Sequence, residues 1–162
     1  MMVPALPVPP AYQGAWPSCS EGGGIFQKAG RWYVMAGVCC CFCHNGANAF
    51  VWISETGPLG PYSLQNSSSS DLLGNVIPFN KTSGMYLTGA QQFSVAQIPL
   101  YNGGEALPVY VGQRFGSADD GLKCHDYQYL APLVVDSNDG TVAEMTWVNE
   151  FTVQINVVPP PT

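Results

Sequence analysis

The stretch IFQKAGRWYVMA, residues 25–36, decides the fold class. Residues 25–28 and 31–36 are short strand-forming runs, and only Ala29 and Gly30 lie between them. Two such runs joined by a two-residue turn that contains glycine are typical of an antiparallel β-hairpin. The sequence therefore predicts that the folded part of the chain begins with a hairpin.

Further short runs of the same kind lie on both sides of a long connection, residues 65–90, which contains a serine tract. The expected strands cover residues 49–54, 62–64, 93–98, 107–114, 127–135 and 145–151. Turn sequences such as GPLGP (57–61) and NDG (138–140) separate several of them. Apolar residues nowhere recur at helical spacing over the length of a helix. The chain is therefore predicted to be all-β, with two tandem four-stranded antiparallel sheets.

Tandem four-stranded sheets favour the blades of a β-propeller. A two-sheet β-sandwich of eight strands explains the same strand pattern equally well, so periodicity alone does not separate the two folds. Residues 1–18 are rich in proline, which lacks the amide hydrogen that helices and central strands need, and they are expected to form an irregular arm. The domain is expected over residues 19–158, about two blades, with residues 159–162 as a tail.

Composition limits the partners and the location. Only 10% of the residues are charged, the formal net charge is −6, and five Lys and Arg residues cannot build a phosphate-binding surface, which excludes nucleic acid. No apolar run is long enough for a membrane helix, which excludes a membrane. Six cysteines, the sequons at Asn66 and Asn80 and the scarcity of lysine favour an extracellular protein. The first residues lack the cationic region of a signal peptide, so the secretion signal is expected outside this chain.

The segment EGGGIFQKAGRWYVM, residues 21–35, resembles the acid-bearing segment of glycoside hydrolase family 43. In that family a Glu, a stretch of small residues, an apolar-Phe pair, a short turn and an aromatic strand follow one another in this order. Further segments are similar to family segments in the same order, and the resemblance covers roughly residues 20 to 155. The further segments are residues 37–43, 54–62, 90–95, 111–115 and 124–129.

The resemblance implies a five-bladed β-propeller with the active site at the mouth of its central channel, of which this chain covers the later part. It implies an enzyme that hydrolyses O-glycosidic bonds in cell-wall polysaccharides containing arabinose, xylose or galactose, with inversion. Glu21 is then the general acid, and a second carboxylate must activate water. In the family that base comes from earlier blades, and it is not identifiable in this chain. The alternative is a catalytically incomplete propeller fragment that binds carbohydrate or has a structural role.

Other polar residues are candidates for contacts with a sugar. Gln92, Gln113 and Arg114 could donate several hydrogen bonds to hydroxyl groups, with ordinary strand-edge polarity as the other interpretation. Most aspartates are expected to cap turns, but Asp126 lies in a segment that resembles one near the family's channel. His125 could face the propeller axis beside a divalent cation such as calcium, with a hydrogen-bonded structural histidine as the competing interpretation. No cofactor is expected to be required.

The cluster CCCFCH, residues 39–44, has spacings found in zinc sites. If residues 39–41 are extended, successive side chains point to opposite faces, and the whole cluster cannot converge on one ion. Disulfides, including an adjacent-cysteine bridge and links to Cys19 or Cys124, are therefore favoured over a metal in a secreted protein. Two blades alone would leave exposed sheet edges, and we expect self-association through an edge, a sandwich-like pairing of the sheets, or poor solubility.

Overall fold

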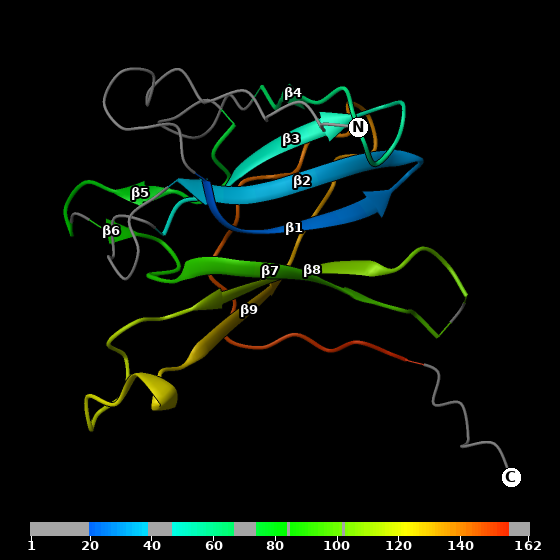
Figure 1. Cartoon of the computed structure of the whole chain (residues 1–162). Coiled ribbons are helices and arrows are strands. Elements are labelled where there is room, and N and C mark those ends of the chain that lie inside the picture. The colour runs from blue at the N-terminus through cyan, green and yellow to red at the C-terminus, as the bar shows by residue number, and fades with distance from the viewer. Residues whose placement is uncertain (1–19, 39–46, 67–73, 84, 102, 156–162) are drawn as a thin grey trace, which may run out of the picture.

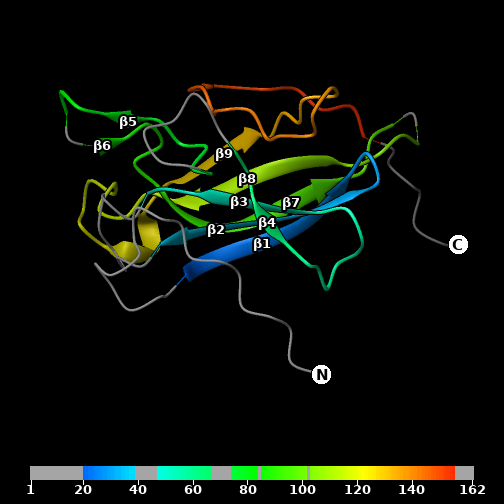
Figure 2. The ribbon, with the colours of Figure 1, turned by 90° about the horizontal axis from the view of Figure 1, so that it is seen from above.

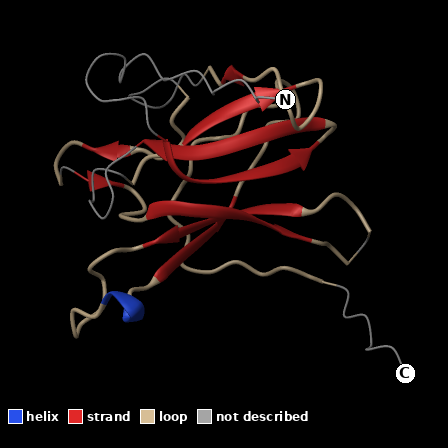
Figure 3. Cartoon of the chain, in the orientation of Figure 1, coloured by secondary structure: helices blue, strands red, loops and turns tan. Residues whose placement is uncertain are grey.

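The structure of the chain is a computed structural model. The structure describes residues 20–38, 47–66, 74–83, 85–101 and 103–155. The strands are β1 (Ser20–Lys28), β2 (Arg31–Val38), β3 (Phe50–Ser54), β4 (Ser63–Leu64), β5 (Phe79–Asn80), β6 (Met85–Tyr86), β7 (Gln91–Ile98), β8 (Leu107–Gln113) and β9 (Gln128–Pro132). A short 3₁₀ helix, η3 (Lys123–His125), is the helical element of the described residues (Figure 3). The prediction of an all-β chain is confirmed.

The first sheet has four antiparallel strands in the order β1-β2-β3-β4, as expected. Its β1–β2 hairpin turns at Ala29 and Gly30, whose φ values are 50° and 77°. Positive φ at both central residues twists a two-residue turn in the same sense as the flanking strands. Lys28 pairs with Arg31 directly across this turn, so the predicted hairpin is confirmed together with its register.

The second sheet has three antiparallel strands, β7-β8-β9, where four were expected. The prediction of a strand over residues 145–151 is wrong, because the backbone there bonds to other parts of the molecule. The amide of Met145 donates to the carbonyl of Val76, and the amide of Val148 donates to the Tyr129 hydroxyl. The connection 65–90, which was expected to be a loop, contains the small β5–β6 hairpin.

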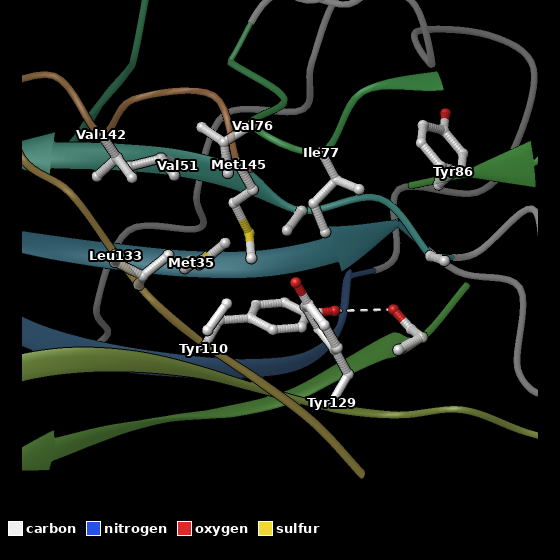
Figure 4. Close-up of a cluster of buried hydrophobic side chains, with 14 of the residues drawn as sticks. Met35, Val51, Val76, Ile77, Tyr86, Tyr110, Tyr129, Leu133, Val142 and Met145 are labelled. Atoms are coloured by element: carbon white, nitrogen blue, oxygen red, sulfur yellow. Dashed lines mark hydrogen bonds between the residues drawn. The ribbon is translucent and has the colours of Figure 1, made fainter. Parts of the chain in front are cut away.

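The two sheets lie one over the other, with β1 against β7 (Figures 1 and 2). Their facing side chains form the main hydrophobic core, which Figure 4 shows. Phe26 and Tyr33 stack there with ring centroids 4.8 Å apart. Large fully buried members come from both sheets and from the connections, among them Met35, Val51, Val76, Ile77 and Tyr110. Burial of these apolar side chains is the main free-energy term that holds the sheets together.

The segment after β9 returns to the first sheet and closes the core from one side. Gln65, which follows β4 and is buried, clamps this segment through Val142. The Gln65 Nε2 donates to the Val142 carbonyl over 2.8 Å, and the Val142 amide donates to Gln65 Oε1 over 2.7 Å. The Tyr33 hydroxyl also donates to the carbonyl of Gly140 over 2.9 Å. Gln65, just after the first sheet, therefore anchors the segment around Val142, which follows the second sheet.

In the part of the chain that the structure describes, no helix is long and apolar enough to cross a membrane.

Candidate active site

Glu21 lies at the start of β1, beside a bulge that the following glycines make possible. It pairs with Gly37, the register then shifts, and Gly24 pairs with Met35. The intervening Gly22 and Gly23 have φ values of 64° and 133°, which side-chain-bearing residues rarely adopt. A bulge re-aims the neighbouring side chain and bends the strand. The glycine run thus sets the direction of the partly exposed Glu21 carboxylate.

Gly24 ends the bulge and brings the first sheet into direct contact with the second. A Cβ atom at Gly24 would lie 2.4 Å from the backbone nitrogen of Val95 in β7. Only the hydrogen side chain of glycine therefore lets β1 approach β7 so closely. This contact also brings the beginnings of β1 and β7 together at one end of the molecule (Figure 1).

The close approach of the two strands puts Glu21 beside Gln91, the first residue of β7. The Gln91 Nε2 donates a hydrogen bond to Glu21 Oε2 over 2.8 Å, and Gln91 is 8% exposed. Sequence reasoning chose the neighbouring Gln92 and missed Gln91. The doublet of glutamines at a strand start was visible in the sequence, but side chains alternate between faces along a strand, and their orientation depends on the register.

Gln92 points into the interior. It is 2% exposed, and its Nε2 donates to the Met35 carbonyl over 3.0 Å, which ties β7 to β2. Among the described residues its Oε1 is buried without a hydrogen-bond partner. The predicted contact between Gln92 and a sugar stays a prediction, and in this arrangement the side chain serves as a bracket between the two sheets.

Gln113, at the end of β8, lies directly across the strand pair from Gln91, and Gln128 of β9 lies across from Gln113. Residues directly opposite in an antiparallel pair share one face of the sheet. A row of amide side chains therefore runs from Gln91 outward, beginning at the Glu21 carboxylate. Of the predicted site residues, Gln113 is a member of this row. Amides and a carboxylate at one strand end are groups that bind hydroxyl-rich ligands.

Arg114 follows Gln113 and packs on aromatic rings. Its guanidinium carbon lies 5.6 Å from the centroid of the Trp147 ring, and Trp147 stacks on Tyr129 with centroids 4.6 Å apart. The Arg114 amide donates to the Tyr127 carbonyl, while its Nε is buried without a partner within the described part of the chain. The cation–π contact holds the side chain at the end of β8. Its predicted contact with substrate stays a prediction.

The predicted residues His125 and Asp126 lie in the connection from β8 to β9. The Asp126 carboxylate accepts backbone amides from Gly116 at 2.9 Å and Ala118 at 3.0 Å. The Gly116 amide in particular holds the pKa of Asp126 below its ordinary value. Asp126 thus organises the turn, as expected of most aspartates in the chain, and its predicted role in a substrate site stays untested.

His125 is exposed at the end of η3 and bonds to a neighbouring carboxylate. Its Nδ1 lies 2.6 Å from Asp120 Oδ2, and both side chains are about half exposed. The hydrogen bond from the Leu122 amide, and to a smaller extent the one from His125, holds the pKa of Asp120 below its ordinary value. Within residues 20–38, 47–66, 74–83, 85–101 and 103–155, no group of three His, Cys, Asp or Glu residues is placed to hold a metal ion. The predicted cation beside His125 stays a prediction, and in this structure the imidazole bonds to the Asp120 carboxylate.

The cysteines give the disulfide prediction little support. Cys124 has a free, exposed thiol. The predicted cluster at residues 39–44 and its other partner, Cys19, lie outside the described residues.

No model of a protein family matches the sequence, and no curated protein matches it. Solved structures are similar to its fold. A GH43 β-1,3-galactosidase with galactodeoxynojirimycin has a TM-score of 0.57 at 15% identity, over 82% of this chain and 32% of that chain. An exo-β-1,3-galactanase from Clostridium thermocellum has a TM-score of 0.54 at 17% identity, over 76% and 23%. A variant exo-β-1,3-galactanase from Phanerochaete chrysosporium with β-1,3-galactotriose has a TM-score of 0.50 at 16% identity, over 78% and 23%.

The chain spans about a third or less of the length of these structures. At this level of identity the likeness concerns the fold, and it covers both sheets. It decides between the two expected architectures, because the similar structures are β-propellers. The chain therefore has the fold of part of a glycoside hydrolase family 43 β-propeller.

Proposed function

We propose that the chain carries the acid-bearing part of a glycoside hydrolase that cleaves O-glycosidic bonds in galactose-containing cell-wall polysaccharide, with Glu21 as general acid. The observation that carries the proposal is the geometry at Glu21. A glycine bulge aims its carboxylate, and Gln91 of the adjacent sheet binds one of its two oxygens. The fold of β-1,3-galactosidases and β-1,3-galactanases supports the choice of galactose.

The hydrogen bond from Gln91 engages Oε2 of the Glu21 carboxyl group. Because Oε2 accepts the amide, Oε1 is the oxygen left to carry the acidic proton. In the proposed reaction water attacks the anomeric carbon, the bond to the leaving oxygen breaks, and that oxygen takes the Glu21 proton. A second carboxylate takes a proton from the attacking water, and the sugar leaves with inverted configuration. No cofactor enters this reaction.

We expect the second carboxylate, which acts as the catalytic base, to come from outside the described residues. Asp126 already uses both of its oxygens to hold a turn, which disfavours it as the base. The similar structures are three or more times as long as the matched part, and their remaining blades offer places for a base. The lack of a suitable base among the described residues favours a second candidate function, in which the chain binds carbohydrate without cleaving it.

Turnover by the full chain should be measured on aryl glycosides, β-1,3-galactan, arabinan and xylan, beside Glu21→Gln. General acid catalysis contributes roughly 10²- to 10⁴-fold, so Glu21→Gln should lose turnover on that scale while it still binds the polysaccharide. Glu150→Gln, which removes an exposed carboxylate from the segment 142–155, is the matched control and should match the unmodified chain. Equal turnover in Glu21→Gln and the unmodified chain would refute Glu21 as the acid. Binding without turnover in all three proteins would favour the non-catalytic function.

Gln91→Leu separates the role of the hydrogen bond from that of the carboxylate. Without the amide, the Glu21 side chain loses the contact that orients it, and we expect a smaller loss, about tenfold in kcat, with KM little changed. A loss as deep as that of Glu21→Gln would mean that Gln91 does more than orient the acid.

A further inference from the structure

One of the two sequons in the chain lies on a protruding hairpin turn. Asn80 is the last residue of β5 and pairs with Met85, the first residue of β6. Asn80, Lys81, Thr82 and Ser83 are all exposed. Figure 1 shows the β5–β6 hairpin at the margin of the molecule, beside one end of the stacked sheets. A bulky group attached at this turn would extend into solvent without displacing the core.

The Asn80 side chain is held by its own turn. Its Oδ1 accepts the amide of Thr82 over 2.9 Å and the amide of Ser83 over 3.1 Å. This is the Asx-turn arrangement, which organises the three residues of the sequon around the asparagine. Both bonds use the oxygen, whereas the nitrogen Nδ2 is the atom to which an oligosaccharide is joined.

We propose that Asn80 is a site of N-glycosylation when the chain passes through a secretory pathway. The co-substrate is an oligosaccharide linked through diphosphate to a lipid. The bond between the anomeric carbon of the oligosaccharide and the phosphate oxygen breaks, and its electron pair leaves with the lipid diphosphate. A bond forms between that carbon and Asn80 Nδ2, which loses one proton to the transferase. No oxidant or reductant is needed.

Asn66, the asparagine of the second sequon, lies in a different setting, while Ser67 and Ser68 lie outside the described residues. Asn66 lines an open cavity of about 510 Å³ together with Arg31, Tyr62 and Asp139. A glycan at Asn66 would have to leave this concave surface, whereas one at Asn80 leaves a protruding turn. We therefore assign the modification to Asn80 and use Asn66 as the comparison within the same chain.

The test is expression of the full chain behind a secretion signal in a eukaryotic cell, with the chain purified from both medium and cell lysate. We expect one N-glycan, seen as a mass that peptide N-glycosidase removes with conversion of Asn80 to aspartate. Asn80→Gln and Thr82→Ala should lose it, whereas Thr82→Ser, which keeps the sequon hydroxyl, and Asn66→Gln should retain it.

Thr82→Ala leaves Asn80 and its bonds to the backbone in place, so its loss of the glycan cannot be a loss of the turn. Transfer takes place before the chain leaves the cell, so the lysate reports on variants that are not secreted. An unglycosylated chain in the lysate, or a glycan that survives Asn80→Gln and disappears in Asn66→Gln, would overturn the proposal.

Discussion

Substituting Gly24 with alanine tests whether the close contact between β1 and β7 holds the two sheets in place. The added Cβ would lie 2.4 Å from the Val95 backbone nitrogen and 2.8 Å from the Val95 Cβ. Ordinary contacts begin at 3.4 Å, so the strands must separate by about 1 Å. The backbone nitrogen cannot rotate out of the way as a side chain can. The shift must therefore be shared by both sheets.

Overpacking of this kind typically costs about 1–3 kcal/mol, and the backbone contact places Gly24→Ala at the upper end, about 3 kcal/mol. For a chain of this size the melting temperature should fall by roughly 6–12 °C. Urea unfolding followed by tryptophan fluorescence measures the loss directly. The Glu21–Gln91 hydrogen bond spans the same two strands, so any glycosidase activity should fall with stability.

Gly57→Ala is the matched control, because a Cβ there meets nothing within 4 Å and its φ lies outside the left-handed region. Its unfolding free energy should stay within about 0.5 kcal/mol of that of the unmodified chain. Gly24→Ala/Val95→Ala removes the contact with Val95 Cγ2 at 2.8 Å but keeps those with the Val95 backbone nitrogen and Cβ, so recovery should be small. If Gly24→Ala and Gly57→Ala unfold at the same urea concentration, the inferred contact is wrong.

Three further substitutions test the buried clamp, the core hydroxyl and the β8–β9 turn. Gln65→Ala leaves the amide and carbonyl of Val142 unpaired in the interior, and denaturant unfolding should show a loss of about 3 kcal/mol. Tyr110→Phe removes the bond to the Ala90 carbonyl and should cost about 1 kcal/mol. Burial raises the pKa of Tyr110 above its usual range, so stability should fall as the pH rises through 10 and above, and this loss should be smaller in Tyr110→Phe, where the raised pKa values of Tyr33 and Tyr62 remain. The pKa of Asp126 lies below its ordinary value of 3.8, so its contribution is complete above that pH and disappears as the pH falls further. Amide exchange in the turn should show this acid loss, and Asp126→Asn should abolish it.

Local signals in the sequence were sufficient for the hairpin and for the strands near it. Ala29 and Gly30 occupy a two-residue turn between strand-forming runs, and such a turn sets the pairing of its neighbours without help from the rest of the chain. The position of Glu21 before a glycine run was also visible, and its role as general acid, which the resemblance implied, stays a prediction. These features depend on residues close together along the chain.

The segment 145–151 shows where local pattern failed. Its composition is that of a strand, yet the Met145 amide bonds to Val76 and the Met145 side chain is buried in the core. Val76 and the core residues around Met145 are distant in sequence. Their contacts with Met145 take the place of the hydrogen bonds that a fourth strand of the second sheet would make. Strand propensity describes a half-buried surface, and which surface is available depends on the tertiary arrangement.

In the candidate site, too, some features can be read from the sequence and others depend on the tertiary structure. Residue types and order along the chain were enough to single out Glu21 and the glutamine doublet, but not to decide which glutamine meets the acid. That choice depends on the register of β7 and on its approach to β1, which the absence of a side chain at Gly24 permits. Gln91 and Gln92 point to opposite faces of the sheet, and a one-residue change in register would have exchanged their faces. The candidate residues can therefore be recognised in the sequence, whereas the hydrogen bond between Glu21 and Gln91 exists only because β1 and β7 approach each other closely at Gly24.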